Sequence, residues 1–284
     1  MNEQQKIFKK VTVSSVAGYW NNRPCNVRHT TAEIGTKQYF DEVEARKYFV
    51  EPHIPGFAEF EKWNGKKVLE IGCGIGTDTI NFARAGAKVT AVDLSSESLK
   101  LARKRAEVMG VSDQVTFYEA NAEELSKVVP PEPYDLIYSF GVIHHTPYPE
   151  NVIKQIIQNY VKEGTVFKIM VYNLYSTKVL RIILKEGNGN FGRAEKLVAI
   201  NSEAQTGCPV TYTYTKYTLP ELIKPFSITE IHTDHIFPFI IKDYVKYKYT
   251  KILIYRWMPS FVFRFLERNF GWHLCATAVF KNKL

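Results

Sequence analysis

A glycine-rich turn between two predicted strands constrains the fold more than any other feature of this chain. Residues 68–71 read VLEI, an almost wholly apolar run that is typical of a strand buried on both faces of a sheet. Three glycines follow within residues 72–76, which allows a tight turn and a close approach of backbone to a ligand. A second predicted strand, 89–92, ends in Asp93, whose carboxylate can accept hydrogen bonds from ribose hydroxyls. The stretch therefore predicts a nucleoside-binding βαβ unit.

The spacing of the glycines distinguishes two kinds of nucleoside site. Gly72, Gly74 and Gly76 form the pattern G-x-G-x-G, whereas dinucleotide-binding enzymes carry G-x-G-x-x-G. An acidic residue, Glu70, stands two positions before the first glycine. This pattern resembles motif I of the class I S-adenosylmethionine (SAM)-dependent methyltransferases. The alternative, a strand-to-helix turn without a ligand, is disfavoured by the motifs that follow it.

Strand and helix patterns alternate through the middle of the chain and predict the fold class. Further strands are expected at 115–119, 134–139 and 165–172, and helices at 77–85, 97–109 and 151–160. Such alternation implies an α/β fold with a Rossmann-like, doubly wound, mostly parallel sheet and helices on both faces. Two later strands, 227–233 and 273–280, bring the predicted sheet to seven strands.

Three parts of the chain are expected. Residues 1–62 are predicted to form a flap or cap, 63–172 the nucleoside-binding core, and 173–284 the rest of the sheet. Two insertions in the last part, 173–217 and 237–272, are predicted to cap a substrate together with residues from the N-terminal part.

Some of these outer segments carry local patterns. Residues 1–30 show no clear helix or strand, and 39–60 show a helical pattern interrupted by prolines. The alternating run PVTYTYTKYTL, at 209–219, predicts a strand or hairpin arm, and 174–185 predict a helix. The insertion at 237–272 is too long for a plain hairpin and is expected to add helices.

Cysteine usage and hydropathy exclude some classes of protein. No apolar run reaches the roughly 18 residues that span a bilayer, and the N-terminus lacks the apolar core of a secretion signal. The four cysteines form no C-x-x-C pair, which argues against a disulfide framework and against a zinc site. We therefore expect a cytoplasmic protein in a reducing compartment.

The positive charge is concentrated in the last part of the chain. Residues 1–172 hold 21 Lys+Arg and 21 Asp+Glu, whereas 173–284 hold 16 against 8, which accounts for the net charge of +8. Such a region suits an anionic substrate, a membrane surface, nucleic acid or simply a solvated lysine-rich face. Tyrosines among these lysines could stack on bases, so RNA is an alternative partner.

Four motifs in order identify a family that the core resembles. The region from about 66 to 172 is similar to class I methyltransferases of the small-molecule group that includes the quinone-biosynthesis methyltransferases. The resemblance implies SAM as cofactor, S-adenosyl-L-homocysteine (SAH) as product, and a set of cofactor-binding residues: Glu70, Gly72, Cys73, Gly74, Gly76, Asp93, Leu94, Asn121, Ala122, Phe140 and Gly141.

Each of these positions has an implied role. Glu70 and the glycine turn lie along the methionine part of SAM, and Phe140 and Gly141 border the sulfonium. Asp93 takes the ribose hydroxyls and Leu94 packs on the adenine. Asn121 and the Ala122 amide read the adenine edge. Relatives more often have aspartate in place of Asn121, but the asparagine carbonyl also accepts a hydrogen bond from the adenine amino group.

Histidines are the candidate catalytic groups. Methyl transfer from a sulfonium needs alignment and exclusion of water more than covalent help, and a hydroxyl nucleophile also needs a base. His144 and His145 follow the fourth predicted strand, where the resemblance puts the reacting methyl group, so either is a candidate base or substrate orienter. The alternative is a structural pair in a loop. His29 is a weaker candidate, and His53 and His273 are predicted to be structural.

The predicted function is methyl transfer to O, N or C of a small aromatic or anionic molecule, by a monomer or homodimer. No metal is expected, because the carboxylate set of catechol-type enzymes is not visible. Four residues ahead of the core form a polar and aromatic cluster that we expect on the substrate side: Tyr19, Trp20, Arg23 and Arg28. An RNA or protein methyltransferase and a non-catalytic SAM-binding module are the alternatives.

Overall fold

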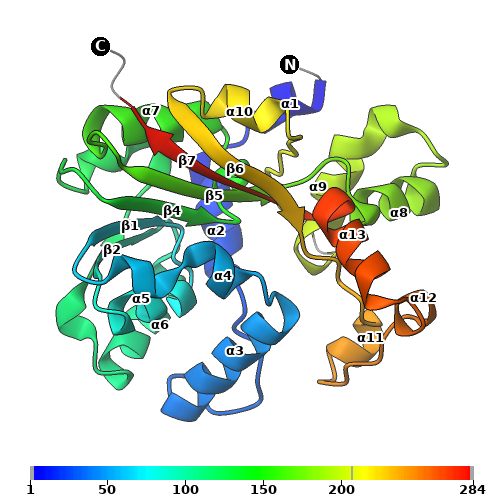
Figure 1. Cartoon of the computed structure of the whole chain (residues 1–284), viewed down its shortest axis with the longest axis horizontal. Coiled ribbons are helices and arrows are strands. Elements are labelled where there is room, and N and C mark those ends of the chain that lie inside the picture. Colours follow the sequence, from blue (N-terminus) through cyan, green and yellow to red (C-terminus); the bar gives the residue numbers. More distant parts are fainter. Residues whose placement is uncertain (1–2, 206, 282–284) are drawn as a thin grey trace.

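The computed structural model describes residues 3–205 and 207–281 and is built around one seven-stranded sheet (Figure 1). The strand order is β3-β2-β1-β4-β5-β7-β6. The strands are β1 (Lys67–Ile71), β2 (Lys88–Asp93), β3 (Val115–Glu119), β4 (Leu136–Phe140), β5 (Val166–Tyr172), β6 (Phe226–Asp234) and β7 (His273–Phe280).

Strand directions confirm the predicted fold class. β1 pairs in parallel with β2 and β4, and only β7 runs antiparallel to its neighbours β5 and β6. After β3 the chain returns to the other side of β1, so the strand order reverses between β1 and β4. In open α/β sheets ligands bind at the carboxyl ends of the strands beside such a reversal.

The two faces of the sheet bury separate hydrophobic clusters. Successive residues of β1 point to opposite faces, so that Val68 packs into one cluster and Leu69 into the other. Both faces of a parallel strand are therefore apolar, as the sequence pattern predicts. The covering helices are α5 (Thr77–Arg84) and α6 (Ser96–Val108) on one face, and α7 (Pro149–Asn159) and α10 (Thr218–Leu222) on the other.

The N-terminal region is more helical than its sequence predicts. Within residues 1–30, which show no clear pattern, the structure has α1 (Glu3–Phe8) and α2 (Val13–Asn22). The Thr12 hydroxyl caps α2 by accepting from the Ser15 N–H (3.2 Å). Val16 is the buried hydrophobic residue of α2, so the helix shows little of the periodic apolar face from which helices are recognised.

The helix predicted over 39–60 is divided. It forms α3 (Lys37–Val50) and α4 (Ile54–Ala58), with Glu51 as the C-cap of the first and His53 preceding the second. Pro52 explains the break, because proline disfavours helical backbone at the residue before it.

The prediction of a strand at 209–219 is wrong. Residues 210–215 belong to no strand of the sheet and make one isolated bridge, between Tyr214 and Asn173, and the run ends in a turn and the start of α10. Its backbone instead contacts the loop after β4, where the Tyr212 N–H donates to the His144 carbonyl (2.9 Å). Two helices precede it, α8 (Thr177–Glu186), which was predicted, and α9 (Ala194–Gln205), which was not.

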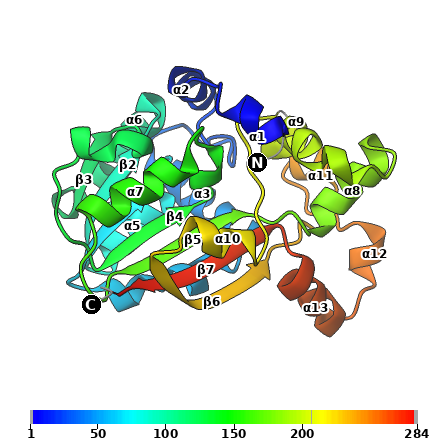
Figure 2. The ribbon, with the colours of Figure 1, turned by 90° about the horizontal axis from the view of Figure 1, so that it is seen from above.

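The C-terminal insertion adds helices, as predicted. These are α11 (Ile241–Tyr244), α12 (Leu253–Arg256) and α13 (Ser260–Phe270). Figures 1 and 2 show them, with α8 and α9, beyond the end of the sheet toward which β6 runs. Short 3₁₀ helices complete the described fold: η1 (Phe60–Trp63), η2 (Ser112–Gln114), η3 (Ala122–Lys127), η4 (Ile143–His145) and η5 (Phe191–Arg193). Among the described residues, no helix combines the length and the apolar character that crossing a membrane requires.

Candidate active site

A cavity of about 250 Å³ lies at the carboxyl ends of the parallel strands. It is lined by the residues that follow β1, β2, β3 and β4, by the end of β5 and by the first residue of β7. Helix α2, the end of α3 and the segment between them complete the wall. Of the predicted cofactor-binding residues, the cavity is lined by Gly72, Cys73, Gly74, Asp93, Leu94, Asn121, Ala122, Phe140 and Gly141.

The glycine turn forms one wall of this cavity. Gly72, Gly74 and Gly76 all have positive φ (+82°, +53° and +77°), which side-chain-bearing residues rarely adopt. A Cβ atom on Gly72 would lie 2.1 Å from Val142 Cγ2, whereas a Cβ on Gly74 would meet nothing within 4 Å. Gly72 is therefore required for packing against the loop after β4, and Gly74 leaves room beside the cavity.

Asp93 holds this turn in place. Its carboxylate accepts the Gly74 N–H and the Ser95 N–H, each at 2.8 Å. Burial raises the pKa of the Asp93 carboxyl, while these backbone N–H groups act in the opposite direction. Each carboxylate oxygen has a second lone pair, so Asp93 can accept further hydrogen bonds from a ligand in the cavity.

Glu70 lies behind the glycine turn. Its side chain is buried, accepts a hydrogen bond from the Thr79 hydroxyl and is not part of the cavity lining among the described residues. Burial, together with the nearby Asp78 carboxylate, raises the pKa of Glu70 to about 8. Gly76 is likewise outside the lining and packs against Ala102 of α6.

The raised pKa of Glu70 predicts how stability depends on pH. A carboxyl group whose pKa rises from 4.5 to about 8 on folding takes up a proton on folding between these values, so stability falls as pH rises across the window. Glu70→Gln should flatten this decline, which reaches up to about 1.4 kcal/mol per pH unit. Urea unfolding across this window checks it, with exposed Glu119→Gln as control. An unchanged slope in Glu70→Gln would show that Glu70 does not titrate in this range.

A buried ion pair that sequence reasoning missed adjoins this wall. Lys47 lines the cavity, and its Nζ lies 2.7 Å from Asp78 Oδ1. The hydroxyls of Tyr48 and Tyr138 donate to the same carboxylate, each at 3.0 Å. No local motif marks Lys47, which reaches the site from α3.

The predicted adenine side is formed by the segments after β2 and β3. Leu94, Asn121 and Ala122 all line the cavity. The Asn121 side-chain oxygen accepts the Glu123 N–H (3.0 Å) and so caps η3. This capping bond positions the side chain and leaves one lone pair of its oxygen for a ligand.

One of the two candidate histidines faces the cavity. His145 is a lining residue, and its Nδ1 lies 2.7 Å from the Val210 carbonyl oxygen. A carbonyl can only accept, so Nδ1 carries the proton and the lone pair of the neutral ring is on Nε2.

The other candidate histidine is buried behind this wall. His144 is fully buried against Tyr172, with ring centroids 4.0 Å apart, and burial lowers its pKa well below the usual value. Neither of its ring nitrogens has a hydrogen-bond partner among the described residues. The arrangement favours His145 over His144 as the group that can meet a substrate.

Of the four N-terminal candidate residues, one lines the cavity and three do not, among the described residues. Trp20 lines the cavity, and its ring centroid lies 5.5 Å from that of His145. The other three are not among the described lining residues. The Tyr19 hydroxyl donates a hydrogen bond to the Gly207 carbonyl, and the Arg23 guanidinium lies over the Tyr19 ring. The backbone carbonyl of Arg28 accepts a hydrogen bond from the Tyr247 hydroxyl.

The two insertions, 173–217 and 237–272, pack behind segments that line the cavity. Among the described residues, neither 173–217 nor 237–272 lines the cavity. The first reaches the back of the histidine loop through Val210, and the second packs on α3, where Arg46 lies over the Tyr244 ring. Several lining residues were not singled out as site residues by sequence reasoning: Val16, Cys25, Asn26, Lys47, Glu51, Met170, Tyr172 and His273.

Comparison with known proteins supports the family resemblance. A family model described as a methyltransferase domain matches residues 62–206, just over half of the chain. The ubiquinone biosynthesis O-methyltransferase of Photorhabdus laumondii subsp. laumondii is 35% identical over 103 residues, which cover 36% of this chain and 42% of that relative. Its counterpart in Actinobacillus pleuropneumoniae serotype 5b is 32% identical over 122 residues, covering 42% and 51%. The chain thus matches about half or less of the length of these curated relatives.

Solved structures share the fold at low sequence identity. Magnesium protoporphyrin IX methyltransferase from Synechocystis PCC 6803, with bound SAH, aligns with a TM-score of 0.56 and 16% identity, over 95% of this chain and 99% of that one. The [4+2]-cyclase SpnF aligns with a TM-score of 0.55 and 13% identity, over 98% and 94%. These likenesses concern the fold alone, since one fold can host different reactions. The family match over residues 62–206 shows that the chain belongs to the methyltransferase-domain family.

Proposed function

We propose that this protein binds SAM in the described cavity and methylates a small molecule, with a phenolic hydroxyl as the acceptor. One observation carries the proposal: the glycine turn and Asp93 share a single cavity with a wall of Trp20, His145 and Tyr172. The names of the curated relatives support an oxygen acceptor. A cavity of about 250 Å³ beside these rings suits a small molecule better than a polymer.

The residues present fit SAM. Asp93 would hold the ribose hydroxyls, the backbone at Gly74 would lie along the methionine part, and Asn121 would meet the adenine. Phe140 and Gly141 would border the sulfur. When bound, SAM supplies a methyl group on a positively charged sulfur that a nucleophile can attack in line.

The chain contributes alignment and a base. The rings of Trp20 and Tyr172 exclude water and restrict how a substrate can lie, which accounts for much of the acceleration in reactions of this kind. His145, with the lone pair of its neutral ring on Nε2, accepts the proton of the substrate hydroxyl. Cys73, Cys208 and Cys275 are free thiols, which supports our further proposal of a reducing, cytoplasmic setting.

Substituting His145 tests the proposed base. His145→Gln keeps a polar side chain of similar length but removes the base, so kcat should fall by about 10²- to 10⁴-fold. SAH affinity should remain within about twofold, because the ring lies on the substrate side. SAH formation with a panel of catechols and hydroxylated aromatic acids measures turnover, and calorimetry measures SAH binding.

A matched control for this variant is His232→Gln. His232 lies on β6, and its Nδ1 is 3.1 Å from Glu230 Oε1. It is not among the described residues that line the cavity. The His232→Gln variant should leave kcat unchanged. Wild-type turnover in His145→Gln would refute the assignment of His145, and failure of every small-molecule acceptor with intact SAH binding would refute the proposed substrate class.

A further inference from the structure

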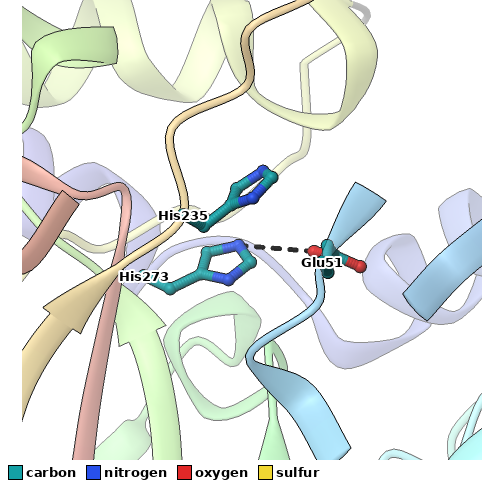
Figure 3. Close-up of side chains that lie close together, drawn as sticks. All are labelled: Glu51, His235 and His273. Carbon is teal, nitrogen blue, oxygen red and sulfur yellow. Dashed lines mark ion pairs between the residues drawn. The ribbon is translucent and has the colours of Figure 1, made fainter. Parts of the chain in front are cut away.

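A second group of polar side chains borders the same cavity. Glu51, His235 and His273 come from the end of α3, the loop after β6 and the start of β7, and they converge as Figure 3 shows. One potential ligand atom from each lies within 4.8 Å of the others. Glu51 and His273 also line the cavity, so the group is accessible to a bound substrate.

His273 is oriented by two contacts. Its Nε2 lies 3.6 Å from Glu51 Oε1, and its Nδ1 lies 3.0 Å from His53 Nε2. His53 Nδ1 is in turn 3.8 Å from Asp234 Oδ1. If His273 Nδ1 carries the proton and donates to His53, its Nε2 lone pair is directed toward Glu51. Metal-binding histidines are commonly oriented in this way by a partner on the other ring nitrogen.

His235 is held in an unusual conformation. Its φ is +68°, in the left-handed region that a residue with a side chain seldom adopts. Its N–H donates to the Asp234 carboxylate (2.7 Å), and its carbonyl accepts the Trp272 N–H (2.8 Å). Its ring stacks on that of His273, with centroids 4.6 Å apart. Strained backbone of this kind clusters at functional sites, where the surrounding structure maintains it.

The chemistry of the three side chains suits a metal ion. Two imidazoles and one carboxylate form the ligand set of many catalytic zinc sites and of non-haem iron(II) sites, both of which leave positions open for substrate or water.

We propose that Glu51, His235 and His273 bind a divalent transition-metal ion, such as Zn²⁺ or Fe²⁺, whose open positions face the cavity. Its role rests on the proposed function: the ion would bind the substrate oxygen and lower the pKa of its hydroxyl. The hydroxyl proton passes to His145, and the oxygen lone pair forms the new bond to the methyl carbon. The carbon–sulfur bond breaks with its electron pair remaining on sulfur, which leaves neutral SAH.

Metal binding by the purified protein tests this directly. The full chain is stripped with a chelator, dialysed and titrated with Zn²⁺, and bound metal is measured by mass spectrometry. We expect one high-affinity ion per chain, and a loss of affinity of at least tenfold in Glu51→Gln and in His235→Ala. Replacement with Co²⁺ should give visible absorption bands of low-coordinate cobalt in the wild type that both variants lose. The control His232→Ala alters a histidine of the neighbouring strand outside the cluster and should bind metal as the wild type does.

The possible results distinguish a failure of the proposed metal site from a failure of the proposed function. SAH binding to the metal-free protein should be unchanged, because Asp93 and the glycine turn need no metal. Absence of stoichiometric metal with intact SAH binding overturns the metal site alone, and so does equal affinity in Glu51→Gln. Metal binding without SAH binding overturns the proposed function instead. Glu51 is partly exposed, so Glu51→Gln keeps the test decisive if His235→Ala fails to fold.

Discussion

Asp93→Ala is expected to weaken SAH binding at least tenfold, on the order of 1.4 kcal/mol. The substitution removes the charged acceptor proposed for the ribose hydroxyls, and hydrogen bonds to charged groups contribute more than neutral ones. It also leaves the N–H groups of Gly74 and Ser95 without the carboxylate that each now contacts at 2.8 Å. The glycine turn would therefore lose its support at the same time as the cofactor loses its anchor.

Two further variants separate these effects. Asp93→Asn keeps one side-chain oxygen to support the turn but lacks the charge, so its affinity should fall between those of wild type and Asp93→Ala. Asp113→Ala, on exposed η2, removes an aspartate that does not line the cavity and should bind SAH normally. Calorimetric titration with SAH gives the affinities directly. Wild-type affinity in Asp93→Ala would contradict the location proposed for the cofactor.

Gly72→Ala is expected to destabilise the protein by about 2–5 kcal/mol and to abolish measurable SAH binding. The positive φ of Gly72 costs an alanine about 1–2 kcal/mol. Its Cβ would also lie 2.1 Å from Val142 Cγ2, and overpacking of this kind costs about 1–3 kcal/mol more. Relief of the clash would displace either the glycine turn or the loop that carries Val142, and Val142 itself lines the cavity.

Gly110→Ala is the matched control for this substitution. Gly110 has a similar positive φ (+70°), but a Cβ there would meet nothing within 4 Å. It should therefore show the conformational cost alone and retain SAH binding. Urea unfolding compares the two variants, and equal stability in both would contradict the tight contact between the turn and Val142.

Local patterns in the sequence were sufficient to predict the sheet. Val68 and Leu69 show the two-sided burial of a central strand, and the helices between strands force parallel crossovers. The helix α2 was missed because its one buried hydrophobic residue, Val16, produces no periodic apolar face. The run at 209–219 alternates like a strand, but in the structure it passes over the histidine loop and makes one isolated bridge to Asn173.

The cofactor side of the site was easier to predict than the substrate side. Gly72 and Asp93 lie in one continuous βαβ unit, so their spacing in the sequence reflects their proximity in space. Glu51 and His273 come from segments far apart in the chain and meet only because β7 is inserted beside β5. No spacing between residues in the sequence indicates that Glu51 and His273 lie close together. For the same reason, the sequence could not distinguish His145, which faces the cavity, from His144, which is buried behind it.

A crystal structure of the protein with SAH tests the central claim most directly. We expect SAH in the described cavity, with its ribose hydroxyls on Asp93 and its sulfur beside Phe140 and Gly141. The space beyond the sulfur should be bordered by His145 and His273, and large enough for one aromatic ring. SAH bound elsewhere, or with its ribose away from Asp93, would contradict the account.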